Sequence, residues 1–113
     1  MESGLKNPSS PGQDTAWDSW QKDRLEWTVQ KSIPAGEYLV RVEHIGLHQG
    51  HEGKAQFYME CYQLKIESEG TGTLEPTVKI PGLYKSSDPG IAFNKWNNPR
   101  SYVMPGPKMY SGQ

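Results

Sequence analysis

The sequence predicts an all-β fold, as part of an antiparallel sandwich, on three observations. Glycine and proline, 12 and 9 of the 113 residues, place turn signals at short intervals along the chain. Residues 16–27 could form about two helical turns, but no longer run has helical periodicity. Three runs are rich in the β-branched and aromatic residues that favour strands: RLEWTVQKSI (24–33), GEYLVRVEHIGLH (36–48) and AQFYMECYQLKIES (55–68).

These elements follow a polar N-terminal segment. Residues 1–20 contain the stretch KNPSSPGQD and predict a polar loop or a disordered arm. Residues 21–70 hold the strand-like runs, and residues 71–113 alternate short apolar pieces with turns. Hydrophobic residues make up only 34% of the chain, but an aromatic content of 11% argues against disorder over most of it. We therefore expect residues 21–113 to belong to one domain.

Charge and hydropathy exclude several classes of partner. Twelve basic and thirteen acidic residues give a net charge of −1, and no basic stripe could follow a nucleic-acid backbone. No apolar stretch approaches the roughly 18 residues of a membrane-spanning helix, so no membrane partner is expected. The N-terminal segment lacks the apolar core of a signal peptide, and the single cysteine, Cys61, cannot form an internal disulfide. Taken alone, these features favour a soluble, intracellular protein.

The second and third runs predict a β-hairpin. Residues 37–48 are expected to pair antiparallel with residues 56–68 across the loop 49–55. One register gathers apolar side chains on a face suited to a core and polar ones on the other face. It pairs Leu47 with Phe57, Ile45 with Met59, His48 with Gln56, Gly46 with Tyr58 and His44 with Glu60.

This hairpin would bring three polar side chains together. His48, Gln56 and Tyr58 converge on one face, beside Gly46, whose missing side chain leaves space. An imidazole, an amide and a phenol can together orient and polarise a small ligand or a metal-bound oxygen. The alternative is three solvated side chains on a polar sheet face.

The histidines by themselves do not predict a zinc site. His44 and His48 have the spacing of two zinc ligands on a helix, but their run is a strand. Four residues of strand separate them by about 13 Å, too far to bind one ion. His51 lies in the glycine-flanked stretch GHEGK and is expected to be solvated.

The order and spacing of four segments carry a resemblance to a known family. These segments are IPAGEYLVRVEHIGLH, AQFYMECYQLKI, PGLYKSSDPGI and YVMPGP. Between about Trp27 and Tyr110 the sequence resembles the C-terminal half of fungal lytic polysaccharide monooxygenases of auxiliary activity family nine, formerly glycoside hydrolase family sixty-one. The resemblance implies a secreted protein with an immunoglobulin-like antiparallel β-sandwich and one copper ion, held by a histidine brace. It also implies oxidative cleavage of cellulose or related β-glucans, with electrons from an external donor. Residues 21–113 would then be the C-terminal portion of a single catalytic domain.

The resemblance also implies roles for individual residues. Tyr58 matches the axial tyrosine of the copper site, and His48 and Gln56 match the pair that hydrogen-bonds the activated oxygen species. Tyr102 resembles a surface tyrosine that contacts the glucan, and a strand-end aromatic is the equal alternative for it. Cys61 matches a cysteine that pairs with a partner in the N-terminal half.

The family's N-terminal half, which carries the brace histidines, has no counterpart in this sequence. Neither the amine of Met1 nor any of the three histidines is expected to replace the brace. We therefore expect a truncated product that binds copper weakly and does not oxidise cellulose alone. Its location is extracellular by resemblance, or intracellular if the truncation is real. The alternative function is a non-catalytic β-sandwich remnant without activity, or one that binds glycan through its tryptophans (Trp17, Trp20, Trp27 and Trp96).

Overall fold

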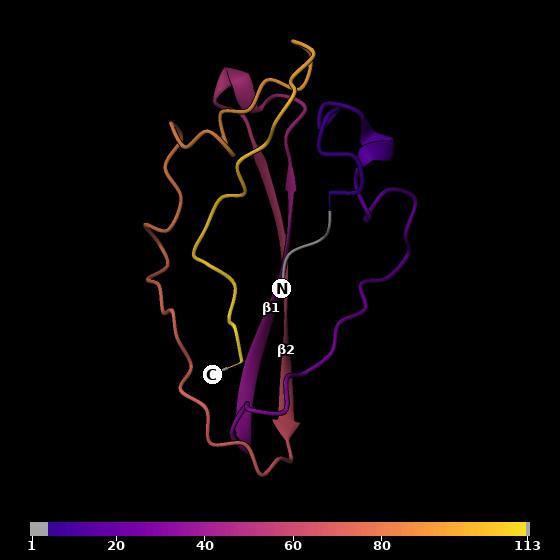
Figure 1. Ribbon diagram of the computed structural model, residues 1–113. Coiled ribbons are helices and arrows are strands. Elements are labelled where there is room, and N and C mark those ends of the chain that lie inside the picture. Colours follow the sequence, from indigo (N-terminus) through magenta and orange to yellow (C-terminus); the bar gives the residue numbers. More distant parts are fainter. Residues whose placement is uncertain (1–4, 113) are drawn as a thin grey trace.

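The computed structural model describes residues 5–112 and contains two long strands (Figure 1). Strand β1 spans Gly36–Gly46 and strand β2 spans Gln56–Ile66. The helical elements of the described residues are two short 3-10 turns, η1 (Asp14–Ala16) and η2 (Gly50–Glu52). The all-β class is therefore confirmed. No helix within residues 5–112 is long and apolar enough to cross a membrane.

The two strands form the predicted antiparallel hairpin over their whole length. Their ladder runs from Gly36 opposite Ile66 to Gly46 opposite Gln56. The loop between them is closed by η2, after which Gly53 adopts the left-handed conformation with φ of 73°. The backbone N–H of Lys54 donates to the carbonyl oxygen of Gln49 at 3.1 Å, which ties the two sides of the loop together.

The register differs from the predicted one by two residues. His44 lies opposite Tyr58, where Gly46 was expected, and Gly46 lies opposite Gln56, where His48 was expected. The reason is that the loop is longer than predicted, because the chain leaves the ladder after Gly46 to form η2. Since the shift is an even number of residues, every side chain of the ladder stays on its predicted face.

Two expected elements in the N-terminal third do not form. Residues 24–33 were expected to be a strand, and residues 16–27 to hold helical turns, but both segments are irregular apart from the end of η1. A strand needs a ladder of bonds to a neighbouring backbone, whereas this run has a local turn, from Ile33 N–H to the Gln30 carbonyl, and a single bond from Gly72 N–H to the Ser32 carbonyl. The left-handed φ of 56° at Gln21 also ends any helical path.

A small core lies at the loop end of the hairpin. Its buried side chains come from the N-terminal segment (Ala16) and from the segment after β2 (Ile91 and Phe93). Gly50, in the loop, is buried against the latter segment, and a Cβ there would lie 2.5 Å from the carbonyl oxygen of Ile91. The loop that carries His48 is therefore anchored on the core.

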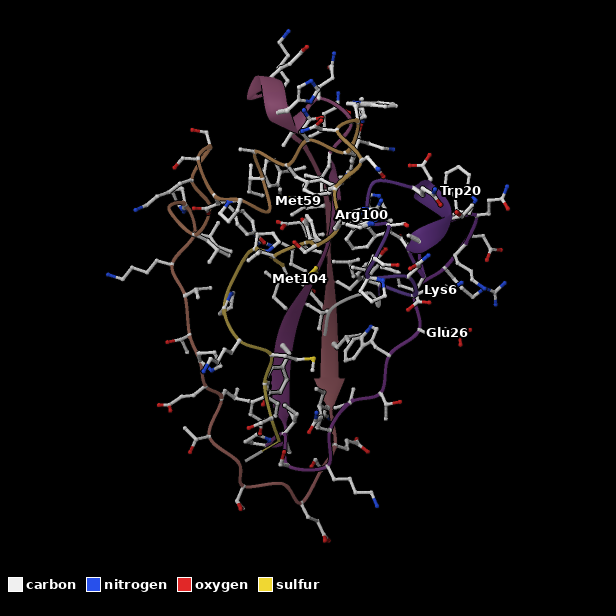
Figure 2. The ribbon with its side chains drawn as sticks, turned by 45° about the horizontal axis from the view of Figure 1, so that its top comes forward. Lys6, Trp20, Glu26, Met59, Arg100 and Met104 are labelled. Carbon is white, nitrogen blue, oxygen red and sulfur yellow. The ribbon has the colours of Figure 1, made fainter. Side chains whose placement is uncertain are left out.

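Residues 5–20 form a loop that is closed by backbone contacts. Leu5 forms a β-bridge with Trp17, and the N–H of Lys6 donates to the carbonyl of Ala16 at 2.8 Å. Figure 2 places Lys6 and Trp20 of this segment, and Glu26 after it, on one side of the hairpin. Residues 1–4 of the predicted arm, with Met1, lie outside the described residues.

Candidate functional site

The structure brings His48, Gln56 and Tyr58 together around Gly46. A Cβ placed on Gly46 would lie 3.6 Å from Gln56 Cβ, 3.6 Å from Tyr58 Cε2 and 3.7 Å from His48 Cε1. Gln56 and Tyr58 reach this point from β2, while His48 reaches it from the start of the loop. The glycine thus provides the space that the sequence suggested, and all three side chains are exposed.

A hydrogen bond links the phenol and the amide. The Tyr58 hydroxyl donates to Gln56 Oε1 at 2.5 Å. Because the amide oxygen accepts from Tyr58, the NH₂ group of Gln56 is the donor that a ligand beside Tyr58 would meet. Tyr58 is 58% exposed, so a ligand can reach its ring and oxygen.

The position of His48 is set through its backbone. Its carbonyl oxygen accepts a hydrogen bond of 2.7 Å from Trp96 Nε1, and the neighbouring Leu47 carbonyl accepts from Gly50 N–H at 3.0 Å. These contacts anchor the main chain on both sides of the imidazole. The ring itself faces solvent beside Gly46 and can donate at one nitrogen and accept at the other.

The observed register brings a second imidazole, that of His44, next to Tyr58. His44 is exposed and lies directly opposite Tyr58 in the ladder. It lines a groove with His48, Trp20 and Trp96, between the N-terminal segment and the hairpin loop. The sequence could have predicted that His44 lies opposite Tyr58 only if the length of the hairpin loop had been known, because that length sets the register.

The described residues do not form a complete metal site among themselves. Within residues 5–112, no three His, Cys, Asp or Glu side chains lie close enough together to hold an ion. His51, in η2, instead lies 3.8 Å from a carboxylate oxygen of Glu52.

Tyr102 is half-buried and packs against two other aromatic rings. Its ring makes edge-on contacts with Trp17 and Phe93, with centroid distances of 5.1 and 4.9 Å. Its hydroxyl donates to the carbonyl oxygen of Gly90 at 2.7 Å. Burial raises the pKa of Tyr102 to about 12. Of the two interpretations of Tyr102, these contacts favour the structural one.

Trp96, one of the four tryptophans that the sequence offered for binding glycan, is exposed beside the site. Its side chain is 66% exposed although its indole N–H is held by His48. The Nζ atom of Lys95 lies 4.9 Å from the Trp96 ring centroid and also pairs with Asp14 at 2.5 Å. Contacts with His48 and Lys95 thus fix the Trp96 ring in a solvent-exposed position next to His48.

We predict that Tyr102→Phe lowers the free energy of unfolding by about 1–3 kcal/mol, because the buried carbonyl of Gly90 loses its donor. Urea unfolding measures this, and Tyr62→Phe, at an exposed tyrosine without such a bond, should change stability by less than about 0.5 kcal/mol. Equal effects of the two variants would contradict the packing role.

The raised pKa of Tyr102 also predicts an alkaline loss of stability. Between the ordinary tyrosine pKa of 10.0 and about 12, the folded protein keeps a proton that the unfolded chain releases. Stability is therefore full below pH 10 and falls as pH rises towards 12. Tyr84, whose pKa is also raised to about 12 by burial and by its bond to Glu43, adds to the loss. Unfolding midpoints of the wild type and of Tyr102→Phe, measured across this pH range, give the part of the alkaline loss of stability that is due to Tyr102.

Comparisons with known proteins agree on one family. The sequence profile of Auxiliary Activity family 9 (formerly GH61) matches residues 1–102. Lytic polysaccharide monooxygenase A of Aspergillus fumigatus is 48% identical over 111 residues, covering 98% of this chain and 38% of the relative. Lytic polysaccharide monooxygenase D of Emericella nidulans is 44% identical, with 98% of this chain and 39% of the relative covered. The chain therefore spans about two fifths of the length of these relatives.

Solved structures show the same kinship. A cellulose-active polysaccharide monooxygenase from M. thermophila superposes with a TM-score of 0.76 and 34% identity, covering all of this chain and 54% of that one. The extended catalytic domain of H. jecorina LPMO9A gives 0.65 and 33% identity, with 73% of this chain and 33% of that one covered. These neighbours are β-sandwiches. Sequence and structure together show that the chain belongs to Auxiliary Activity family 9.

Proposed function

We propose that this chain is part of a copper-dependent monooxygenase that cleaves cellulose or related β-glucans by oxidation. The observation that carries the proposal is the convergence of His48, Gln56 and Tyr58 around Gly46 on an exposed face. The proposal is supported by the family, and by the cellulose activity that is stated for the relative from M. thermophila. Under this proposal, the enzyme acts outside the cell and receives its electrons from an external donor.

The side chains present suit one side of a copper site. Copper accepts imidazole nitrogen and, more weakly, oxygen in an axial position. The exposed Tyr58 hydroxyl would offer copper a weak oxygen ligand, and the nitrogen ligands would come from polypeptide beyond the described residues. When bound, copper supplies the one-electron chemistry that activates dioxygen or peroxide.

The chain's own residues would position the oxidant. Gln56 is held by the Tyr58 hydroxyl, so its NH₂ group can donate to an oxygen atom beside the phenol. The imidazole of His48 can donate or accept a proton beside the same oxygen atom. The bond from Trp96 Nε1 to the His48 carbonyl holds the backbone from which this side chain extends. The protein thus contributes preorganised hydrogen bonds, which need no rearrangement when the oxidant arrives.

An assay of oxidised products tests this function. The chain is co-expressed with the polypeptide that corresponds to the part of the M. thermophila enzyme it does not match, and is loaded with Cu²⁺. With cellulose and ascorbate, we expect soluble oxidised oligosaccharides that vanish on chelation. A stable complex that binds cellulose without such products would refute the proposal and favour the non-catalytic, glycan-binding alternative.

We also propose that Trp96 contacts the glucan in place of Tyr102. An exposed indole beside His48 offers a flat apolar face to a sugar ring. We expect Trp96→Ala to weaken cellulose binding about fivefold, which is about 1 kcal/mol of lost stacking. Trp96→Phe keeps an aromatic face but loses the bond to His48, so it should retain most of the binding. Depletion of protein from solution by cellulose measures both, and equal losses would show that the bond, rather than the ring, matters.

A further inference from the structure

Lys95 is an unusually buried lysine, and the proposed function does not yet use it. Its side chain is only 15% exposed, whereas lysine side chains normally keep their ammonium groups in water. Two partners replace the lost water. A carboxylate oxygen of Asp14 lies 2.5 Å from the Nζ atom, and the ring centroid of Trp96 lies 4.9 Å from it. The ammonium group is therefore bound both to an anion and to the face of an aromatic ring.

Asp14 is brought to Lys95 by close packing of the N-terminal segment. Gly12 lies so near the backbone of Lys95 that a Cβ on Gly12 would overlap the Lys95 carbonyl oxygen. The indole N–H of Trp17 donates to the carbonyl oxygen of Pro11 at 3.1 Å, which closes the turn around Asp14. An ion pair whose groups are already placed together by the backbone loses less side-chain entropy than one between two free side chains. The pair can therefore act as a fixed support for whatever Lys95 touches.

Trp96 is held at three points that leave one face of its ring open. Its backbone N–H donates to Asn94 Oδ1 at 3.0 Å, and its indole N–H donates to the His48 carbonyl at 2.7 Å. The Nζ atom of Lys95 lies over one face of the ring. Since the side chain is still 66% exposed, the ring keeps an open face. These contacts fix the plane of the indole and determine which of its faces a sugar ring can meet.

We propose that Lys95 is a positioning residue for the contact with the glucan. Held by Asp14, its ammonium group orients the Trp96 indole, so that the open face meets a sugar ring while the indole N–H stays on His48. A sugar that stacks there is placed in a fixed position relative to His48. Without the ammonium group the ring is free to turn, and binding has to order it again. The inference rests on the proposed function, because it takes the glucan as the ligand of Trp96.

Solvent exchange of the Trp96 indole N–H tests the positioning without any glucan. Nuclear magnetic resonance of the 113-residue chain resolves the signals of its four indoles, and Trp96→Phe identifies the signal of Trp96. Lys95→Met keeps the length of the side chain but removes the charge. In this variant we expect the Trp96 signal to exchange at least about fivefold faster, because the bond to His48 opens more often. Lys95→Arg, whose guanidinium group can also pair with Asp14 and stack on the indole, should stay within about twofold of the wild type.

Two controls separate positioning from a general loss of stability. The indole N–H of Trp17 is also hydrogen-bonded, so global destabilisation by Lys95→Met would speed the exchange of Trp17 and Trp96 together. Lys65→Met removes another ion-paired lysine, near the other end of the hairpin, and should leave both signals unchanged. Asp14→Asn, at a side chain that is 52% exposed, should act like Lys95→Met. It keeps the test available if Lys95→Met does not fold.

Depletion of the chain from solution by cellulose tests the consequence for the glucan. Lys95→Met and Asp14→Asn should weaken binding about threefold, less than Trp96→Ala, because the ring remains but must be ordered on binding. The proposal is overturned if Lys95→Met exchanges or binds cellulose like Lys65→Met, or if the signals of Trp96 and Trp17 speed up together. A wild-type chain that does not bind cellulose would refute the glucan contact itself. Faster exchange of the Trp96 signal alone in Lys95→Met would then still support the positioning of the ring.

Discussion

We expect a polypeptide of these 113 residues to bind Cu²⁺ with a dissociation constant above about 1 μM, which is less than about 8 kcal/mol of binding free energy. Copper(II) takes most of its affinity from imidazole and amine nitrogens in a square plane. Even if His44 and His48 both contributed, about half of that plane would be left to water. The phenol of Tyr58 adds at most a weak axial oxygen. Co-expression with the unmatched part of the M. thermophila enzyme should raise the affinity at least about 1,000-fold.

Isothermal titration measures both affinities, and it is best done with Cys61→Ser. The exposed thiol of Cys61 would otherwise bind or reduce copper by itself. The matched comparison is the same substitution in the co-expressed complex. Submicromolar binding by the 113-residue polypeptide, together with oxidised oligosaccharides that vanish on chelation, would contradict this prediction. It would mean that nitrogen ligands are available within these residues.

The hairpin was predictable because its information is local. Alternation and β-branched residues identify both strands, and parity alone decides which side chains share a face. The register was missed by two residues because the loop geometry depends on Gly50 packing against the segment around Ile91. The run 24–33 has strand composition but remains irregular, because its backbone contact with the segment around Gly72 is limited to its last residues and forms no ladder.

The residues of the candidate site also differ in how well the sequence could place them. Gln56 and Tyr58 stay on the predicted face because the register shift is even, whereas His48 lies outside the ladder and reaches them from the loop. The positions of Trp96 and Tyr102 could not be predicted, because both are set by contacts between segments far apart in the chain. Trp96 is bound to a carbonyl 48 residues away, and Tyr102 packs against Trp17. Composition cannot distinguish an indole held in the open from a phenol turned inwards.

Replacing Gln56 by alanine should lower the rate of cellulose oxidation by the copper-loaded complex about 10- to 100-fold, the usual cost of losing a partner beside a metal site. The substitution removes the acceptor of the Tyr58 hydroxyl and the NH₂ donor together. Copper affinity should change little, because no nitrogen ligand is lost. Gln63→Ala is the matched control, since it removes the same side chain from the opposite face of β2 and should keep the rate within about twofold.

Gln56→Glu separates the two functions of the amide. A carboxylate at this position still accepts from the Tyr58 hydroxyl but has no proton to donate to an oxygen atom of the oxidant. If the NH₂ group positions the oxidant, Gln56→Glu should lose as much activity as Gln56→Ala, while copper affinity and cellulose binding stay near the wild-type values. A rate close to wild type for Gln56→Glu would show that Gln56 acts only by holding Tyr58. If Gln56→Ala is as active as Gln63→Ala, the amide has no part in the reaction, and the convergence around Gly46 is a solvated sheet face.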